Sequence, residues 1–204
     1  MKIEVQQVGQ LMTNCYIVWD EHTKNAAVID PGDDGAYLAD RLRKNGLTLQ
    51  YILLTHGHFD HITGVPELLE TCGSEPKVYM SHKDLKLEAV FHESVALDPA
   101  LVTDWKDGDT VTMDSITFRV LETPGHTPGS VCLIAGDVIF SGDTLFQGSC
   151  GRTDFPGGSW SDMCASLRRL YELKGDYTVL SGHTGSTTLE RERKTNMFMQ
   201  SALG

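Results

Sequence analysis

Short apolar or alternating runs, separated by turn-forming residues, recur along the chain and predict a protein rich in β-strands. In the first half the predicted strands span residues 3–8, 14–19, 26–30, 49–54 and 77–80. In the second half they span residues 116–121, 130–135, 138–141 and 177–181. The third of these runs ends in Asp-Pro-Gly, a turn signal, so we expect short strands with close connections.

Helices are predicted between several of these strands. Apolar spacing and cap residues indicate helices over residues 37–45, 65–71 and 160–171. Ser81 suits the N-cap of a further helix that runs to about Glu93, and a capping box at residues 187–190 starts a last, charged helix. Residues 94–104 are less regular, and we expect them to form a variable lid over the substrate.

Four predicted strands, ending at Leu54, Leu121, Ser141 and Ser181, are each followed by a short turn that carries histidine or aspartate. The first of these turns, residues 55–61, reads Thr-His-Gly-His-Phe-Asp-His. Such a polar cluster is poorly suited to a core and well suited to a metal. Because strand ends are rigid, we expect the four turns to converge on one edge of a sheet.

The converging set contains these potential metal ligands: His56, His58, Asp60, His61, His126, Asp143 and His183. Catalytic zinc takes about four or five ligands and leaves one position for water, so this larger set suits two metals that share a bridging group. Asp143 can span both ions with its two oxygens. Two divalent ions against Asp60 and Asp143 leave a net positive site, where a bridging water becomes a nucleophilic hydroxide near neutral pH.

Each downstream residue also has a structural interpretation. Taken singly, His126 suits a loop, Asp143 an Asx turn and His183 a helix cap, and only the whole set favours metal binding. Asp30 either orients a metal ligand or forms a turn, and both interpretations remain open. Three histidines lack such neighbours and are interpreted as surface or capping residues: His22, His82 and His92.

Composition narrows the class of protein. The 204 residues suit one domain, and no apolar stretch is long enough to span a membrane. The net charge of −11 is spread along the chain, which disfavours a nucleic-acid partner and nuclease chemistry. The chain has no signal-peptide pattern and an odd number of cysteines without a CxxC pair, so we expect a cytoplasmic protein with reduced thiols. Cys150 is interpreted as structural rather than as a spare metal ligand.

Five segments, in order along the chain, resemble the motifs of the metallo-β-lactamase superfamily. They are residues 28–32, 55–61, 123–130 (Thr-Pro-Gly-His-Thr-Pro-Gly-Ser), 141–146 (Ser-Gly-Asp-Thr-Leu-Phe) and 181–183 (Ser-Gly-His). The resemblance implies an α+β fold, a four-layer αββα sandwich with metals at one edge between two sheets. It also implies that Asp143 bridges two metals, the first held by His56, His58 and His126, the second by Asp60, His61 and His183.

Within the superfamily the chain looks like hydroxyacylglutathione hydrolase, or glyoxalase II. It is most similar to the short bacterial type II members, which share the Gly-Arg-(Ser/Thr)-Asp-Phe-Pro-x-Gly segment, here residues 151–158. This implies hydrolysis of S-lactoylglutathione-type hydroxyacyl thioesters to D-lactate and a free thiol. Longer members carry a C-terminal helical domain that holds glutathione, and we expect residues 1–204 to form one hydrolase domain without it. Arg152 can supply a positive charge to the substrate, whereas Phe155 lacks the hydroxyl found in longer members.

Other activities remain open. A mononuclear iron persulfide dioxygenase shares Cys-Gly-Arg-Thr-Asp-Phe, here residues 150–155, and would use His56, His126 and Asp143 as its ligands. A lactonase, a β-lactamase or another ester or amide hydrolase would use the same metals. A zinc-stabilised binding protein would instead need a closed ligand shell. We expect two divalent ions, with zinc favoured over iron or manganese, and a small-molecule acyl substrate.

Overall fold

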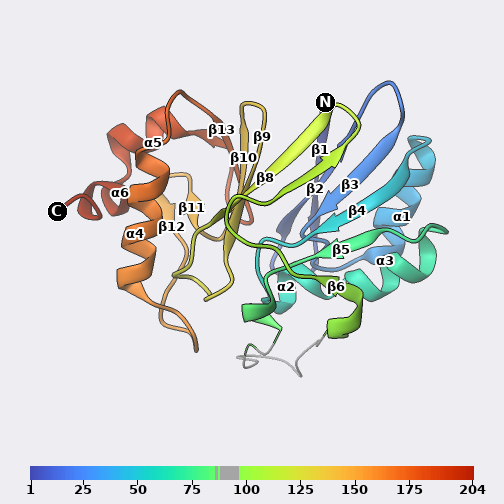
Figure 1. Cartoon of the computed structure of the whole chain (residues 1–204), viewed down its shortest axis with the longest axis horizontal. Coiled ribbons are helices and arrows are strands. Elements are labelled where there is room, and N and C mark those ends of the chain that lie inside the picture. Colours follow the sequence, from blue (N-terminus) through green and yellow to red (C-terminus); the bar gives the residue numbers. More distant parts are fainter. Residues whose placement is uncertain (86, 88–96) are drawn as a thin grey trace.

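The computed structural model describes residues 1–85, 87 and 97–204. In this described part, two main sheets pack face to face with helices on both outer faces (Figure 1). The first sheet contains, in spatial order, β1 (Lys2–Val8), β2 (Thr13–Trp19), β3 (Asn25–Ile29), β4 (Thr48–Leu53), β5 (Lys77–Tyr79) and β6 (Val102–Thr103). The second contains β14 (Thr187–Thr188), β13 (Thr178–Ser181), β10 (Val138–Gly142), β9 (Val131–Ala135), β8 (Ile116–Glu122) and β7 (Thr110–Met113).

Helices form the two outer layers. The first sheet is covered by α1 (Gly35–Lys44) and α3 (Val65–Thr71), and the second by α4 (Trp160–Tyr171), α5 (Leu189–Thr195) and α6 (Met197–Ser201) (Figure 1). Smaller elements are the single turn α2 (Phe59–Ile62), 3₁₀ turns at His82–Asp84 and Pro99–Leu101, and a hairpin of β11 (Leu145–Phe146) and β12 (Ser149–Cys150). The predicted αββα sandwich is confirmed. None of the helices in the described ranges is long and apolar enough to cross a membrane.

Side-chain alternation along the strands explains the layers. In β2, Cys15 and Ile17 pack into the core beneath α1 and α3, whereas Tyr16 and Val18 face the second sheet. Tyr16 meets Phe140 of β10 across the sandwich, with ring centroids 5.4 Å apart. A third core lies between the second sheet and α4 to α6. Strands with both faces buried are nearly continuous in apolar character, which is why short apolar runs located them correctly.

All nine predicted strands are confirmed, and each observed end lies within a residue of the predicted one. The helices predicted over 65–71 and 160–171 have the predicted ends, and α1 starts two residues before the predicted 37–45. The last helix starts at a capping threonine, but one residue later than the predicted capping box at 187–190, since Thr188 Oγ1 accepts a hydrogen bond from the Arg191 N–H at 3.2 Å. It breaks at Asn196, whose Oδ1 accepts the Phe198 N–H at 3.0 Å and thereby caps α6.

The helix predicted from Ser81 to about Glu93 is wrong in its described part. Ser81 does cap a turn, but that turn is 3₁₀ and ends at Asp84, and Leu87 is not helical. The Asp84 carboxylate is bonded to loops elsewhere in the chain, so tertiary contacts hold this segment. The remainder of that helix, and residues 94–96 of the expected lid, lie outside the described residues. Within the lid, residues 97–104 contain the second 3₁₀ turn and β6, and the lid role stays a prediction.

Candidate metal centre

The predicted ligands come from the ends of strands in both sheets. His56 and His58 lie in the loop after β4, and the adjoining turn α2 carries Asp60 and His61. From the second sheet, His126 lies between β8 and β9, Asp143 follows β10 and His183 follows β13. The expected convergence is therefore correct, but it takes place at one edge of the sandwich, between two sheets, and not along one sheet.

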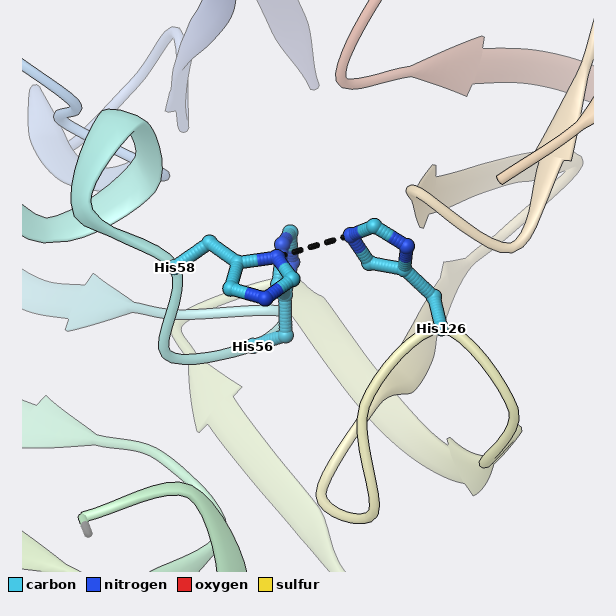
Figure 2. A group of neighbouring side chains, drawn as sticks. All are labelled: His56, His58 and His126. Carbon is cyan, nitrogen blue, oxygen red and sulfur yellow. Dashed lines mark hydrogen bonds between the residues drawn. The ribbon is translucent and has the colours of Figure 1, made fainter. Parts of the chain in front are cut away.

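Three histidines form the first group, which we call the three-histidine cluster: His56, His58 and His126. One ring nitrogen of each lies within 4.8 Å of the others. Figure 2 shows the His58 and His126 rings pointing toward each other from opposite loops, with His58 Nδ1 2.8 Å from His126 Nε2. Nitrogens from three rings gathered at one point suit a shared cation.

The second group, which we call the aspartate cluster, consists of Asp60, His61 and His183. His183 Nε2 lies 3.1 Å and His61 Nε2 lies 3.6 Å from Asp60 Oδ2. Asp143 lies between the two clusters, with Oδ1 3.5 Å from His61 Nε2 and Oδ2 3.4 Å from His126 Nε2. One carboxylate therefore reaches both groups, which is the arrangement that a bridging ligand requires.

Hydrogen bonds on the outer side of three rings fix their tautomers. His61 Nδ1 donates to Asp30 Oδ2 at 2.9 Å, and His126 Nδ1 donates to the Arg152 carbonyl oxygen at 2.7 Å. His56 Nδ1 lies 3.1 Å from Thr55 Oγ1, which itself donates to Asp30 Oδ2. Because a carbonyl or carboxylate only accepts, the outer nitrogen carries a proton, and Nε2 is the nitrogen left to face a metal.

Three of the inner donor atoms in the described part of the chain have no hydrogen-bond partner. Among the residues that the structure describes, His56 Nε2, His61 Nε2 and Asp143 Oδ1 are buried without a hydrogen bond. Buried polar atoms are otherwise almost always satisfied, so these atoms indicate a missing partner that accepts lone pairs. Imidazole and carboxylate donors in this number fit divalent ions such as zinc, iron or manganese.

The two clusters differ in their protonation. Burial and the neighbouring imidazoles lower the pKa of His58 to about 4, and the same causes hold the pKa of His56 well below its usual value. Burial acts in the same direction on His61, but the carboxylates of Asp143, Asp30 and Asp60 outweigh it and hold its pKa above the usual value. His56 and His58 therefore present neutral rings at neutral pH, while protons compete for His61 in the aspartate cluster.

Asp30, left open by the sequence, contacts the predicted ligand His61 directly. Besides His61, it accepts the Thr55 N–H on Oδ1 and the Thr55 hydroxyl on Oδ2, both at 2.7 Å. It also sits in the left-handed region, with φ 53°, at the end of β3. Thus it both turns the chain and orients His61.

Two supporting residues were missed by sequence reasoning. Thr13 donates its hydroxyl to Asp60 Oδ2 at 2.9 Å, and the buried Asp84 accepts hydrogen bonds from the two loops of the three-histidine cluster. Burial raises the pKa of the Asp84 carboxyl above its usual value. For Asp84 the only local signal was a charged residue in the first turn of the expected helix, three positions after the predicted cap Ser81.

Glycines allow the loops to approach the ligands. A Cβ added at Gly151 would overlap the carbonyl oxygen of Asp143, and one at Gly182 would crowd the Asp143 carboxylate and the His61 ring. Neither position tolerates a side chain without moving a proposed ligand. The motifs contain glycine at these positions because the backbone packs directly against the site.

Arg152 lies beside the site with its charge already paired. Its guanidinium makes two hydrogen bonds of 2.7 Å to Asp154 and stacks over Phe155, with Cζ 3.8 Å from the ring centroid. The Phe155 ring lies 5.9 Å from that of His58. The side chains of Arg152 and Asp154 are 53% and 67% exposed, so a substrate group can compete for this pair.

The other histidines and cysteines in the described ranges do not join the site. His82 Nε2 lies 3.0 Å from the Val102 carbonyl oxygen, as expected for a structural residue, and His22 is exposed; His92 lies outside the described residues. All five cysteines, which lie in the described ranges, are free thiols. Burial raises the pKa of Cys150 to about 11, and the residue packs against the core under α4, which agrees with a structural role.

The sequence profile of the metallo-β-lactamase superfamily matches residues 8–183. The chain belongs to the metallo-β-lactamase superfamily. Its similarity to hydroxyacylglutathione hydrolase GloC of Haemophilus influenzae is 36% identity, covering 98% of this chain and 99% of that protein. Superfamily membership and the two donor clusters support a metal-dependent hydrolase.

Solved structures agree with this metallo-β-lactamase fold. The BLEG-1 B3 metallo-β-lactamase superposes with a TM-score of 0.83 and 34% identity, covering 97% of this chain and 99% of that one. TTHA1623 in a di-iron-bound form superposes with a TM-score of 0.81 and 35% identity, covering 96% of this chain and 99% of that one. ETHE1 from Myxococcus xanthus superposes with a TM-score of 0.80 and 32% identity, covering 96% of this chain and 83% of that one. Neighbours of one fold thus include a β-lactamase and a di-iron protein, so the chemistry has to be argued from the site.

Proposed function

We propose that this chain is a dinuclear metal-dependent thioesterase that acts on S-lactoylglutathione-type hydroxyacyl thioesters. The observation that carries the proposal is the pair of donor clusters with Asp143 between them. The similarity to GloC over almost the whole length of both chains supports the substrate class. The di-iron form of TTHA1623 supports a two-metal centre, with iron as well as zinc as candidates.

The three-histidine cluster would hold one ion and the aspartate cluster the other. When bound, the ions would lower the pKa of a water molecule and polarise the thioester carbonyl. The carboxylates of Asp60 and Asp143 would balance part of the positive charge of the two ions, so the site as a whole would stay net positive. The hydrogen bonds that the histidines donate to Asp30, Thr55 and the Arg152 carbonyl hold the ligands in position in advance, so little reorganisation is required.

The more exposed ligands mark the side from which a substrate approaches. The side chain of His183 is 26% exposed, compared with 9% for Asp143. His58 is partly exposed as well, and Phe155 with the stacked Arg152 lies next to it. A thioester placed there would have its carbonyl at the centre and an anionic group near Arg152. A thiol with a pKa of about 8.5 leaves readily as an anion, so cleavage of a thioester requires no strong general acid.

Arg152 is proposed as the contact for a substrate carboxylate. In the free protein it is paired with Asp154, so a substrate gains only the difference between two exposed ion pairs. Such pairs contribute roughly 0.2–1 kcal/mol each. We therefore expect Arg152→Ala to raise KM by about 3-fold, with kcat and metal content unchanged. A fall in metal content would instead assign Arg152 a structural role, through the carbonyl that orients His126.

The direct test is to incubate the metal-loaded protein with S-D-lactoylglutathione and to measure hydrolysis as the loss of the thioester. We expect turnover that Asp60→Ala abolishes, because Asp60 lies within 3.6 Å of both histidines of its cluster. If the fully metal-loaded protein leaves the thioester intact, the proposed substrate class is wrong.

The second candidate is a mononuclear iron persulfide dioxygenase. The similarity to ETHE1 from Myxococcus xanthus and the Cys-Gly-Arg-Thr-Asp-Phe segment at residues 150–155 favour it. It would use His56, His126 and Asp143, which lie together at the site. Oxygen consumption with glutathione persulfide, in the absence of thioester hydrolysis, would establish it in place of the thioesterase.

A further inference from the structure

The Asp84 carboxylate joins two loops that are far apart in sequence. Asp84 Oδ2 accepts the Gly57 N–H at 3.0 Å and the Thr127 hydroxyl at 2.6 Å, while Oδ1 accepts the Gly129 N–H at 2.7 Å. Asp84 is only 3% exposed. Gly57 lies between His56 and His58, and Thr127 follows His126, so the three hydrogen bonds reach both sides of one cluster (Figure 2).

We infer that Asp84 is a positioning residue for the three-histidine cluster and controls the affinity of that metal position, not of the other. This inference rests on the proposed two-metal function. Asp84 acts through the two loops: in the described part of the chain its side-chain hydrogen bonds go to the Gly57 N–H, the Thr127 hydroxyl and the Gly129 N–H, and none goes to a ring nitrogen. It links the loop of the first sheet to the loop of the second.

The loops are shaped to admit this carboxylate. A Cβ at Gly129 would lie 2.6 Å from Asp84 Cγ, and a Cβ at Gly57 would lie 2.8 Å from Asp84 Cβ, both closer than real contacts allow. The absence of side chains at these two positions therefore permits the hydrogen bonds. A buried carboxylate is costly unless its oxygens are satisfied, and here two N–H groups and one hydroxyl satisfy them.

The aspartate cluster has a separate support. Thr13 donates to Asp60 Oδ2 at 2.9 Å, and the described contacts of Asp84 include none to Asp60, His61 or His183. The two metal positions therefore depend on different supporting residues. Removing each support should weaken one position and spare the other, whereas a general loss of stability would weaken both.

The test is a zinc titration in competition with a chromogenic chelator, which resolves two binding steps. His58→Ala and His183→Ala assign each step to its cluster, because each removes a ligand from only one. We expect Asp84→Asn to weaken the three-histidine step by about 10- to 100-fold, the usual effect of losing a residue that orients a ligand. Thr13→Val should weaken the other step. In the His58→Ala background, Asp84→Asn should leave the remaining step within about 2-fold, since additivity holds for independent sites.

Asp20→Asn is the matched control. Asp20 is also 3% exposed and likewise accepts two backbone N–H groups, of His22 and Thr23, and one hydroxyl, of Ser115. It lies at the opposite end of β2 from Thr13, roughly 20 Å away at the usual rise per residue. This variant should lower thermal stability without changing either zinc step.

Gly129→Ala is a second variant that keeps the carboxylate but displaces it, and it should reproduce the selective loss if Asp84→Asn does not fold. The inference is overturned if both steps weaken equally, or if neither variant changes the three-histidine step. The proposed function fails separately, if wild-type protein binds a single ion. In that case the inference still holds if His58→Ala abolishes binding of that ion and Asp84→Asn weakens its binding. If no ion binds, the inference fails together with the proposed function.

Discussion

Asp30→Asn is the perturbation that separates the chemistry of a supporting carboxylate from its backbone role. Asp30 has φ 53°, and asparagine tolerates this left-handed conformation about as well as aspartate, so the backbone is not strained by the change. Only the hydrogen-bonding capacity changes. Three donors, the Thr55 N–H, the Thr55 hydroxyl and the His61 Nδ1–H, now face one acceptor oxygen and one amide NH₂.

Neither orientation of the new amide suits all three donors. If its oxygen faces Thr55 N–H, the NH₂ meets the Nδ1–H of His61, and the ring changes tautomer so that a proton occupies the inner Nε2. If its oxygen faces His61, the NH₂ meets the Thr55 N–H at 2.7 Å. Hydrogen bonds to a charged group contribute about 1.5–3 kcal/mol each, so the metal-free protein should lose about 2–4 kcal/mol of unfolding free energy. Zinc affinity at the aspartate cluster should fall by about 10- to 100-fold, or roughly 1.4–2.7 kcal/mol.

Urea unfolding of metal-free protein and chelator competition measure these two quantities. Asp20→Asn is again the control, because it removes a buried carboxylate of similar hydrogen bonding at a distance from the centre. We expect both variants to be less stable and only Asp30→Asn to lose zinc affinity. If Asp30→Asn binds zinc as wild type does, the assignment of the His61 tautomer, and the role of Asp30 in orienting it, are refuted.

Asp154→Asn frees the guanidinium of Arg152, so KM for an anionic thioester should fall by about 2- to 5-fold while KM for a neutral thioester stays constant. Steady-state kinetics with both substrates measures this, and an equal fall in both KM values would refute it. Lowering the pH should empty the aspartate cluster before the three-histidine cluster, because Asp143 helps hold the pKa of His61 above its usual value against burial, whereas that of His58 is lowered to about 4. Zinc content measured between about pH 5 and 8 tests this order, and simultaneous loss contradicts it. Removing metal that was present at about 100 times its Kd should lower Tm by roughly 5–10 °C, and an unchanged Tm in calorimetry would mean that the bound metal adds nothing to stability.

Much of the fold could be predicted because its signals are local. Strands such as β9 and β10 are short apolar runs between turn residues, and periodicity alone placed them. β7 was missed because Thr-Val-Thr-Met at Thr110–Met113 alternates between buried and exposed over too few residues to stand out. The helix after Ser81 failed for the opposite reason: a local cap signal was present, but contacts elsewhere in the chain decide the conformation.

The candidate ligands were predictable for a related reason. Each follows the end of a strand by eight residues or fewer, so its position in sequence indicates its position in space. The supporting residues could not be predicted, because their hydrogen-bond partners are remote in sequence. Asp84 accepts hydrogen bonds from residues 27, 43 and 45 positions away, and Thr13 donates one to Asp60, 47 positions away. The pairing of Arg152 with Asp154 is local but ambiguous in sequence, since a charged pair two residues apart forms only in some loop conformations.

The most direct test of the central claim is to titrate metal-free protein with zinc, and in parallel with iron, while following hydrolysis of S-D-lactoylglutathione. The account predicts that the rate of hydrolysis rises until two equivalents are bound, as two clusters that share Asp143 require. A maximum at one equivalent of iron, with oxygen consumed on addition of glutathione persulfide and the thioester left intact, would contradict it.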